Sequence, residues 1–126
     1  MNDVIKSRSF AQLAADLAKP GGQIALDLAQ NPAACHLLHM AVGVSGEAGE
    51  LLDAVKKAVI YQKPLDRENV VEELGDLRFY MAGLMNALNI SEAELLYANN
   101  AKLAKRYAAG AYSNEQAQER ADKNET

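Results

Sequence analysis

Apolar residues recur at steps of three and four along most of the chain, which is the period of an amphipathic helix. No segment alternates apolar and polar residues in the way a half-buried strand does. The pattern therefore predicts an all-α fold. The predicted helical segments are 7–19, 24–29, 32–61, 67–88 and 92–107.

Capping residues support the predicted boundaries of the longer helices. Asn31 precedes a proline at the first helical position, and Asp66 stands where it can cap the segment that begins at residue 67. Asn89 should end that segment, and Ser91 begins a capping-box pattern. Because the intervening loops are short, we expect the helices to pack as an antiparallel four-helix-type bundle.

The length and composition fit one globular domain. The chain has 126 residues, of which 49% are apolar. We expect a single all-α domain over residues 1–112, followed by a polar tail or arm over residues 113–126 with at most a short, frayed helix. The one cysteine, Cys35, has no disulfide or metal partner at suitable spacing, and we interpret it as a small core residue.

Charge and hydropathy exclude several classes of partner. The chain shows no signal-peptide pattern and no long apolar stretch, so we expect a cytoplasmic protein without a membrane span. A net charge of -4 argues against a nucleic-acid backbone as the main partner, because binders of that kind carry a basic surface. An acidic protein can still bind an anion if clustered carboxylates hold a cation.

Two pairs of acids stand out on the predicted helices. Glu47 and Glu50 lie three residues apart, as do Glu73 and Asp76, so each pair shares one helix face. A site with carboxylate ligands and no histidine favours a hard divalent cation. Magnesium is the expected cation, with manganese as the alternative. Magnesium commonly binds substrate phosphates as well. These four acids are therefore candidate ligands for Mg²⁺ and a phosphorylated substrate.

The same acids are also consistent with ordinary solvent-facing positions. Against that interpretation, like charges on an otherwise apolar helix repel one another unless a cation lies between them. Gly49 and Gly75 stand at equivalent places within the two motifs, where each glycine costs about 1 kcal/mol relative to alanine. Such glycines indicate close helix approach or room for a ligand, but spacing alone leaves both interpretations of the acids open.

The wider pattern resembles the MazG-like all-α nucleoside triphosphate pyrophosphohydrolases, a family related to the dimeric dUTPases, in a short version of the kind also carried by phages. The similarity covers about residues 36–112, with 22 residues between the two acid motifs. The matching motifs are His39, Gly43, Gly46-Glu47-Ala48-Gly49-Glu50-Leu51, Lys56-Lys57, Glu72-Glu73-Leu74-Gly75-Asp76 and Asn99-x-x-Lys102-Leu103-x-x-Arg106-Tyr107.

The resemblance implies cleavage between the α and β phosphates of a nucleoside triphosphate, with Glu47, Glu50, Glu73 and Asp76 as metal ligands. Either Glu47 or Glu50 is the candidate catalytic base, and Glu72 is an outside candidate because Gly46 occupies the place where some relatives carry an extra acid. The candidate substrate-binding residues are Lys102, Arg106, Asn99 and Lys57, with Lys56 left open between function and surface. The preferred nucleotide does not follow from any short motif.

Two other functions compete with this interpretation. A carboxylate-bridged metal oxidase would need Glu-x-x-His repeats, and neither His36 nor His39 provides one. A non-catalytic helical assembly module has no use for the doubled acid motif. The helix over 32–61 is apolar around much of its circumference, so we expect a homodimer or homotetramer. Five aromatic residues could supply a base-stacking wall, but their helical spacing favours the core, and we assign base recognition to none of them: Phe10, Tyr61, Phe79, Tyr80 and Tyr107.

Overall fold

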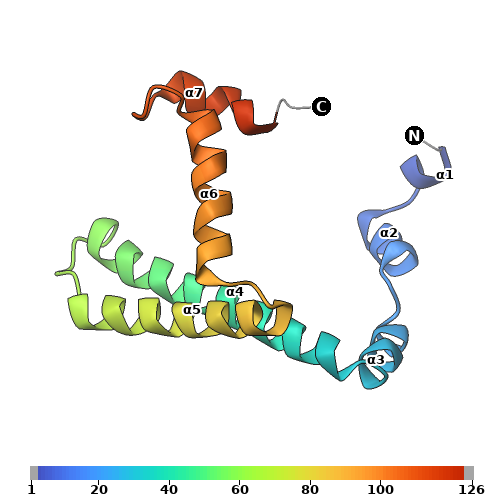
Figure 1. Cartoon of the computed structure of the whole chain (residues 1–126). Helices are drawn as coiled ribbons and strands as arrows, with labels where there is room; N and C mark the ends of the chain where they lie inside the picture. Colours follow the sequence, from blue (N-terminus) through green and yellow to red (C-terminus); the bar gives the residue numbers. More distant parts are fainter. Residues whose placement is uncertain (1–2, 124–126) are drawn as a thin grey trace. The chain divides into compact units, whose positions relative to one another are not determined.

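The computed structural model describes residues 3–123 and confirms the all-α prediction, with no strand in that part of the chain (Figure 1). Contacts divide it into an N-terminal unit, which extends to His39, and a C-terminal unit, which begins at Met40. The elements are α1 (Asp3–Lys6), α2 (Phe10–Leu17), α3 (Gly21–Ala29), α4 (Pro32–Val59), α5 (Arg67–Leu88), α6 (Glu92–Arg106), α7 (Asn114–Glu119) and a final 3-10 turn (Ala121–Lys123).

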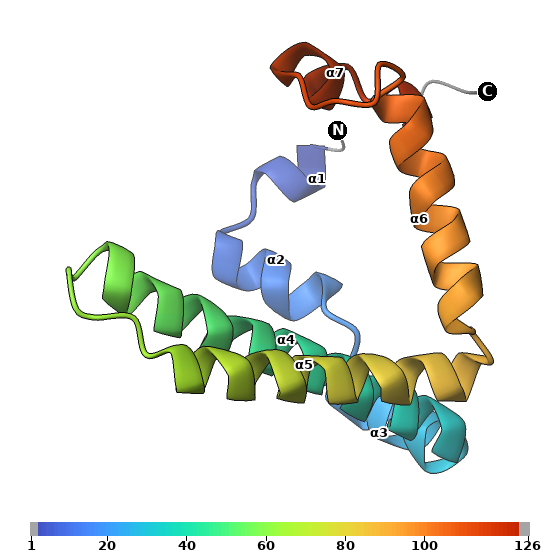
Figure 2. The same cartoon turned by 60° about the vertical axis from the view of Figure 1, so that its left-hand side comes forward.

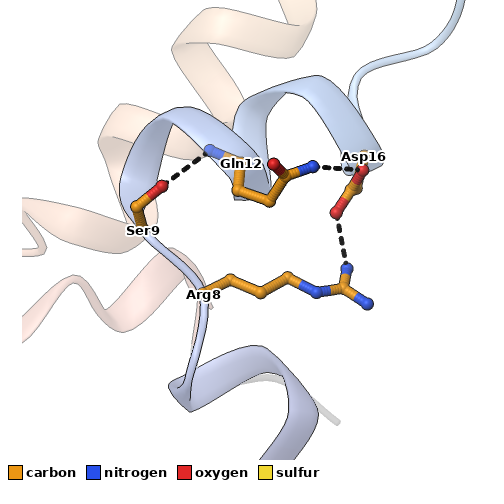
Figure 3. Close-up of polar contacts among 4 residues, drawn as sticks. All are labelled: Arg8, Ser9, Gln12 and Asp16. Carbon is orange, nitrogen blue, oxygen red and sulfur yellow. Dashed lines mark hydrogen bonds and ion pairs between the residues drawn. The ribbon is translucent and has the colours of Figure 1, made fainter.

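Local polar contacts define α2 in the N-terminal unit. The Ser9 hydroxyl accepts a hydrogen bond from the Gln12 amide and so caps the helix. The Gln12 side chain donates to Asp16, which also pairs with Arg8 at 2.9 Å (Figure 3). The predicted segment 7–19 is therefore shorter in the structure, because Ser9 starts the helix and Ala18 has extended backbone angles.

Asn31 caps α4 as predicted, since its side-chain oxygen accepts a hydrogen bond from the Ala34 amide. The prediction for Cys35 is wrong, because this residue is exposed. Its thiol lies 3.3 Å from the Leu28 carbonyl oxygen, to which it donates. The first turn of α4 thus contacts the end of α3 without enclosing the sulfur.

In the C-terminal unit, α4 and α5 form an antiparallel pair, which Figures 1 and 2 show side by side. A Cβ atom added at Gly43 would overlap the Tyr80 ring, and one added at Gly83 would overlap the Met40 side chain. Gly83 lies three residues after Tyr80, and its neighbour Met40 lies three residues before Gly43, so the two contacts define an antiparallel register. The two glycines let these helices approach closely.

The ends of α5 and the start of α6 agree with their predicted positions. Asp66 accepts a hydrogen bond from the Asn69 amide, and Asn89 ends the helix in the left-handed region, with φ 54°. Ser91 caps α6 by accepting from the Glu94 amide. These local signals place the turn between the two helices.

The segment after α6 folds back on that helix. Asp122 receives two hydrogen bonds from the Arg106 guanidinium, at 2.8 and 3.2 Å, and its side chain is only 3% exposed. Ser113 caps α7, so the short helix expected there is present. The proposed boundary at residue 112 stays a prediction, and residues 124–126 of the proposed tail lie outside the described residues.

Very little of the described chain is buried. Met40 and Ala54 are the two buried apolar residues among those described. The prediction that aromatic residues belong to the core is wrong for Phe10 and Phe79, which are 89% and 67% exposed. Antiparallel packing is established here for α4 and α5, and a closed four-helix bundle stays a prediction.

Candidate metal centre

The antiparallel register of α4 and α5 brings three of the four predicted acids together. Gly43 faces Tyr80, and one turn farther along α4 Glu47 meets the part of α5 that carries Glu73 and Asp76. Each of these three acids offers an oxygen atom that lies within 4.8 Å of the other two. The doubled motif thus becomes a single cluster, which we call the acidic cluster (Glu47, Glu73, Asp76).

The carboxyl group of Glu73 has a raised pKa because of its surroundings in the acidic cluster. Burial raises the pKa of its carboxyl above the usual range, and a hydrogen bond with Glu47 raises it further. The negative charges of Glu47, Glu50 and Asp76 act in the same direction. A proton or a metal cation placed among these oxygens would relieve the repulsion.

The chemistry of the acidic cluster fits a hard divalent cation. Its donors are carboxylate oxygens from two helices, and neither histidine nor cysteine belongs to it. Glu47 and Glu73 are half-buried whereas Asp76 is exposed, so the cluster is open to solvent at Asp76. A bound divalent cation would neutralise phosphate charge and lower the pKa of a water molecule.

Glu50 does not belong to the acidic cluster, although it lies near enough to raise the pKa of Glu73. It is exposed, one turn beyond Glu47 on α4. Glu72 is exposed on α5 and is likewise outside the cluster. The structure therefore separates three close carboxylates from a fourth one at their edge.

The glycines of the two acid motifs have no close neighbour among residues 3–123. A Cβ atom added at Gly49 or at Gly75 would meet nothing within 4 Å. Of the two explanations offered from the sequence, close helix approach is wrong for these two positions within the chain. Close approach occurs instead at Gly43 and Gly83, which no doubled motif marks in the sequence.

One further acid of α4, Asp53, is not identified from the sequence. Asp53 lies one turn beyond Glu50 and pairs with Lys57 at 2.8 Å and with Lys56 at 3.5 Å. The signal was present, because Glu47, Glu50 and Asp53 continue the same three-residue step. The three-residue step alone does not distinguish Asp53 from an ordinary residue of the helix surface.

The candidate substrate-binding residues of α6 are placed differently from one another. Asn99 and Lys102 are exposed on the helix. Arg106 is only 17% exposed and is held by Asp122, and that carboxylate raises the pKa of the guanidinium. None of the three contributes to the acidic cluster, and their role toward a substrate stays a prediction.

Two clefts of the C-terminal unit lie away from the acids. One, of about 350 Å³, is at the corner of α5 and α6, where Arg78 pairs with Glu92 at 3.0 Å. The other, of about 320 Å³, lies between Leu103 and Tyr112 at the end of α6. No member of the acidic cluster lines either cleft.

Comparison with protein families matches residues 36–110 to the MazG nucleotide pyrophosphohydrolase domain. The chain belongs to this family. The matched region contains both acid motifs and ends at Gly110, so it includes every residue of the acidic cluster. Comparison with curated proteins and with solved structures gave no significant match.

Membership of the MazG family makes this protein a nucleotide pyrophosphohydrolase, and hence a hydrolase that acts on a nucleotide substrate. MazG enzymes use a divalent metal, and this chain carries the acidic cluster of Glu47, Glu73 and Asp76. The family match argues against both competing functions, the metal oxidase and the assembly module. Within the described residues, no helix combines the length and apolarity needed to cross a membrane.

Proposed function

We propose that this MazG protein is a magnesium-dependent hydrolase of nucleoside triphosphates that cleaves the bond between the α and β phosphates. The products are a nucleoside monophosphate and pyrophosphate. The observation that supports this proposal is the convergence of Glu47, Glu73 and Asp76 from two antiparallel helices. Manganese is the alternative cation, because it prefers the same oxygen donors.

We propose different roles for the four acids according to their positions, with three as metal ligands and one as the catalytic base. Glu47, Glu73 and Asp76 would hold the cation, since their oxygens already lie within 4.8 Å of one another. Glu50, exposed at the edge of the cluster, would complete the site and accept the proton of the attacking water. An accepting carboxylate needs access to water, and Glu50 has that access.

The phosphate chain of the substrate is proposed to bind basic side chains of this chain. Lys57 follows the acids on α4, and Lys102 on α6 is exposed. Asn99, one turn before Lys102, is the proposed hydrogen-bonding partner of a phosphate or sugar oxygen. Arg106 can take part only if it shares or releases its two hydrogen bonds with Asp122.

Hydrolysis of a triphosphate should release pyrophosphate and nucleoside monophosphate in equal amounts. The expected result follows if attack occurs at the α phosphorus, because the β and γ phosphates then leave together. A panel of canonical and modified triphosphates with Mg²⁺ should be resolved by anion-exchange chromatography. Diphosphate with orthophosphate as the products would contradict the proposed bond.

We also propose that the protein works as a homodimer or homotetramer. On α4, Leu52 and Val59 are 67% and 61% exposed, and on α5 Phe79 is 67% exposed. Burying such side chains favours association by about 25 cal/mol per Å² of apolar surface. A helix of 28 residues is about 42 Å long, so α4 presents a long surface to a second copy.

Light scattering coupled to gel filtration should give at least twice the 13.6 kDa of one chain at micromolar concentration. Replacing Leu52 or Phe79 with a charged residue should lower this mass, because a charge on an apolar contact must be removed from water. As a control, Glu68→Lys changes the charge of an exposed residue on α5 and should leave the mass unchanged. An active monomer of the wild type would contradict the proposal.

A further inference from the structure

The acidic face of α4 continues past the metal motif to Asp53. Glu50 and Lys57 are seven residues apart, so they share a face of the helix at a distance of about 10 Å along its axis. Asp53 lies between them, three residues after Glu50 and four before Lys57. Side chains on a helix lean toward its N-terminus, which directs Lys57 toward Asp53 and the acids.

The two lysines that pair with Asp53 differ in their contacts. Its carboxylate lies 2.8 Å from the Lys57 Nζ and 3.5 Å from the Lys56 Nζ. Lys56 also lies over the Tyr61 ring, 5.6 Å from the ring centroid. Lys56 therefore has the longer contact with Asp53 and a second partner in the Tyr61 ring, whereas Lys57 has the short contact with Asp53.

The charges of this region support the distinction. A hydrogen bond from Lys57 lowers the pKa of Asp53, and the same contact raises the pKa of Lys57. The negative charge of Glu50 raises the pKa of Lys57 further. Lys57 thus interacts with the carboxylates of the site while it is held by Asp53.

We propose that Asp53 is a positioning residue that holds the Lys57 ammonium one turn beyond Glu50, where it binds the phosphate chain of the triphosphate. The inference rests on the proposed function. A divalent cation at the acidic cluster neutralises only part of a triphosphate's charge, so a fixed ammonium beside it adds a favourable contact. Asp53 itself contacts neither substrate nor metal.

A purely structural ion pair would behave differently. Exposed pairs four residues apart on a helix add little to the free energy of unfolding. Asp53 is 39% exposed and Lys57 is 55% exposed, so this pair belongs to that class. Loss of the pair should therefore change the melting temperature very little, and any large effect on substrate affinity would come from the position of Lys57.

The test compares Asp53→Asn, Lys57→Met and the double variant. Each single variant should raise KM about tenfold, as expected when a contact with a charged donor is lost, while kcat changes less than about twofold. The double variant should be no worse than Lys57→Met, because Asp53 acts through that lysine. Asp53→Glu, which keeps a carboxylate, should recover part of the affinity.

Binding provides a readout that is independent of turnover. Calorimetric titration with inorganic triphosphate and Mg²⁺ should show the same tenfold weakening in Asp53→Asn. Titration with Mn²⁺ alone should give the wild-type affinity, because Asp53 is not a metal ligand. Two matched controls should behave as wild type: Lys56→Met, and Asp27→Asn, which removes the exposed Lys19–Asp27 pair at 2.6 Å.

The outcomes separate this inference from the proposed function. If the wild type hydrolyses triphosphates but the effects of Asp53→Asn and Lys57→Met add, Asp53 does not act through Lys57 and the inference is wrong. Weakened Mn²⁺ binding in Asp53→Asn would make Asp53 a ligand and would also overturn it. If the wild type neither hydrolyses any triphosphate nor binds inorganic triphosphate, the proposed function itself is wrong.

Discussion

The variants Glu73→Gln and Asp76→Asn should each lose about two to three orders of magnitude in kcat/KM, the size of effect seen when one preorganised electrostatic group is removed from a site. Both substitutions keep the shape of the side chain and remove a charge. Their oxygens lie within 4.8 Å of each other and of Glu47, so each contributes to the same cation site. Rates of pyrophosphate release with excess triphosphate and Mg²⁺ would measure the loss.

Two controls separate this effect from a general loss of structure. Glu68→Gln changes an exposed acid in the first turn of α5 and should retain wild-type turnover and the wild-type helical spectrum. A chelator in excess should abolish wild-type turnover, and added Mg²⁺ should restore it. Near-normal turnover in both Glu73→Gln and Asp76→Asn would show that these acids are surface residues.

Local signals predicted the helices well. Asp66 and Asn89 delimit α5 at the expected residues, because a capping hydrogen bond and a left-handed residue act within one turn of the chain. The pairing of Glu73 with Asp76 on one face is equally local, since it follows from the helical period. Such features can be derived from neighbouring residues alone.

Contacts between distant residues could not be derived in the same way. The resemblance makes Arg106 a candidate substrate-binding residue, but it gives no sign of the contact with Asp122, which lies sixteen residues along the chain and holds the guanidinium. The position of Glu50 outside the acidic cluster depends on the register between α4 and α5. No period within a single helix specifies that register.

Burial was predicted least well. The expectation that Phe79 lies in the core assumed that one chain covers its own apolar faces, but that ring is 67% exposed. An apolar helix face indicates that its residues are more stable when buried, but it does not identify the partner that covers them. If the proposed oligomer forms, the same apolar pattern would describe a contact between copies.

The register itself gives the last prediction, which concerns Gly43. A Cβ atom at this position would overlap the Tyr80 ring, so the larger side chain of Gly43→Val must push α5 away from α4. Overpacking of this kind typically costs about 1–3 kcal/mol. Because Glu47 is one turn from Gly43 and Asp76 is one turn from Tyr80, the displacement should also separate the acids of the cluster.

Gly43→Val should therefore lower kcat/KM by about a hundredfold or more, since a shift of about 1 Å at catalytic groups can cost that much. Chemical denaturation and steady-state kinetics would measure the two effects on one preparation. Gly46→Ala is the matched control, because its Cβ atom meets nothing within 4 Å and alanine should add about 1 kcal/mol of helix stability. A smaller partner in Gly43→Val/Tyr80→Leu should restore part of the stability, because it removes the overlapping ring. If Gly43→Val retains wild-type stability and turnover, α4 and α5 do not pair in this register, and the acidic cluster must be assembled in another way.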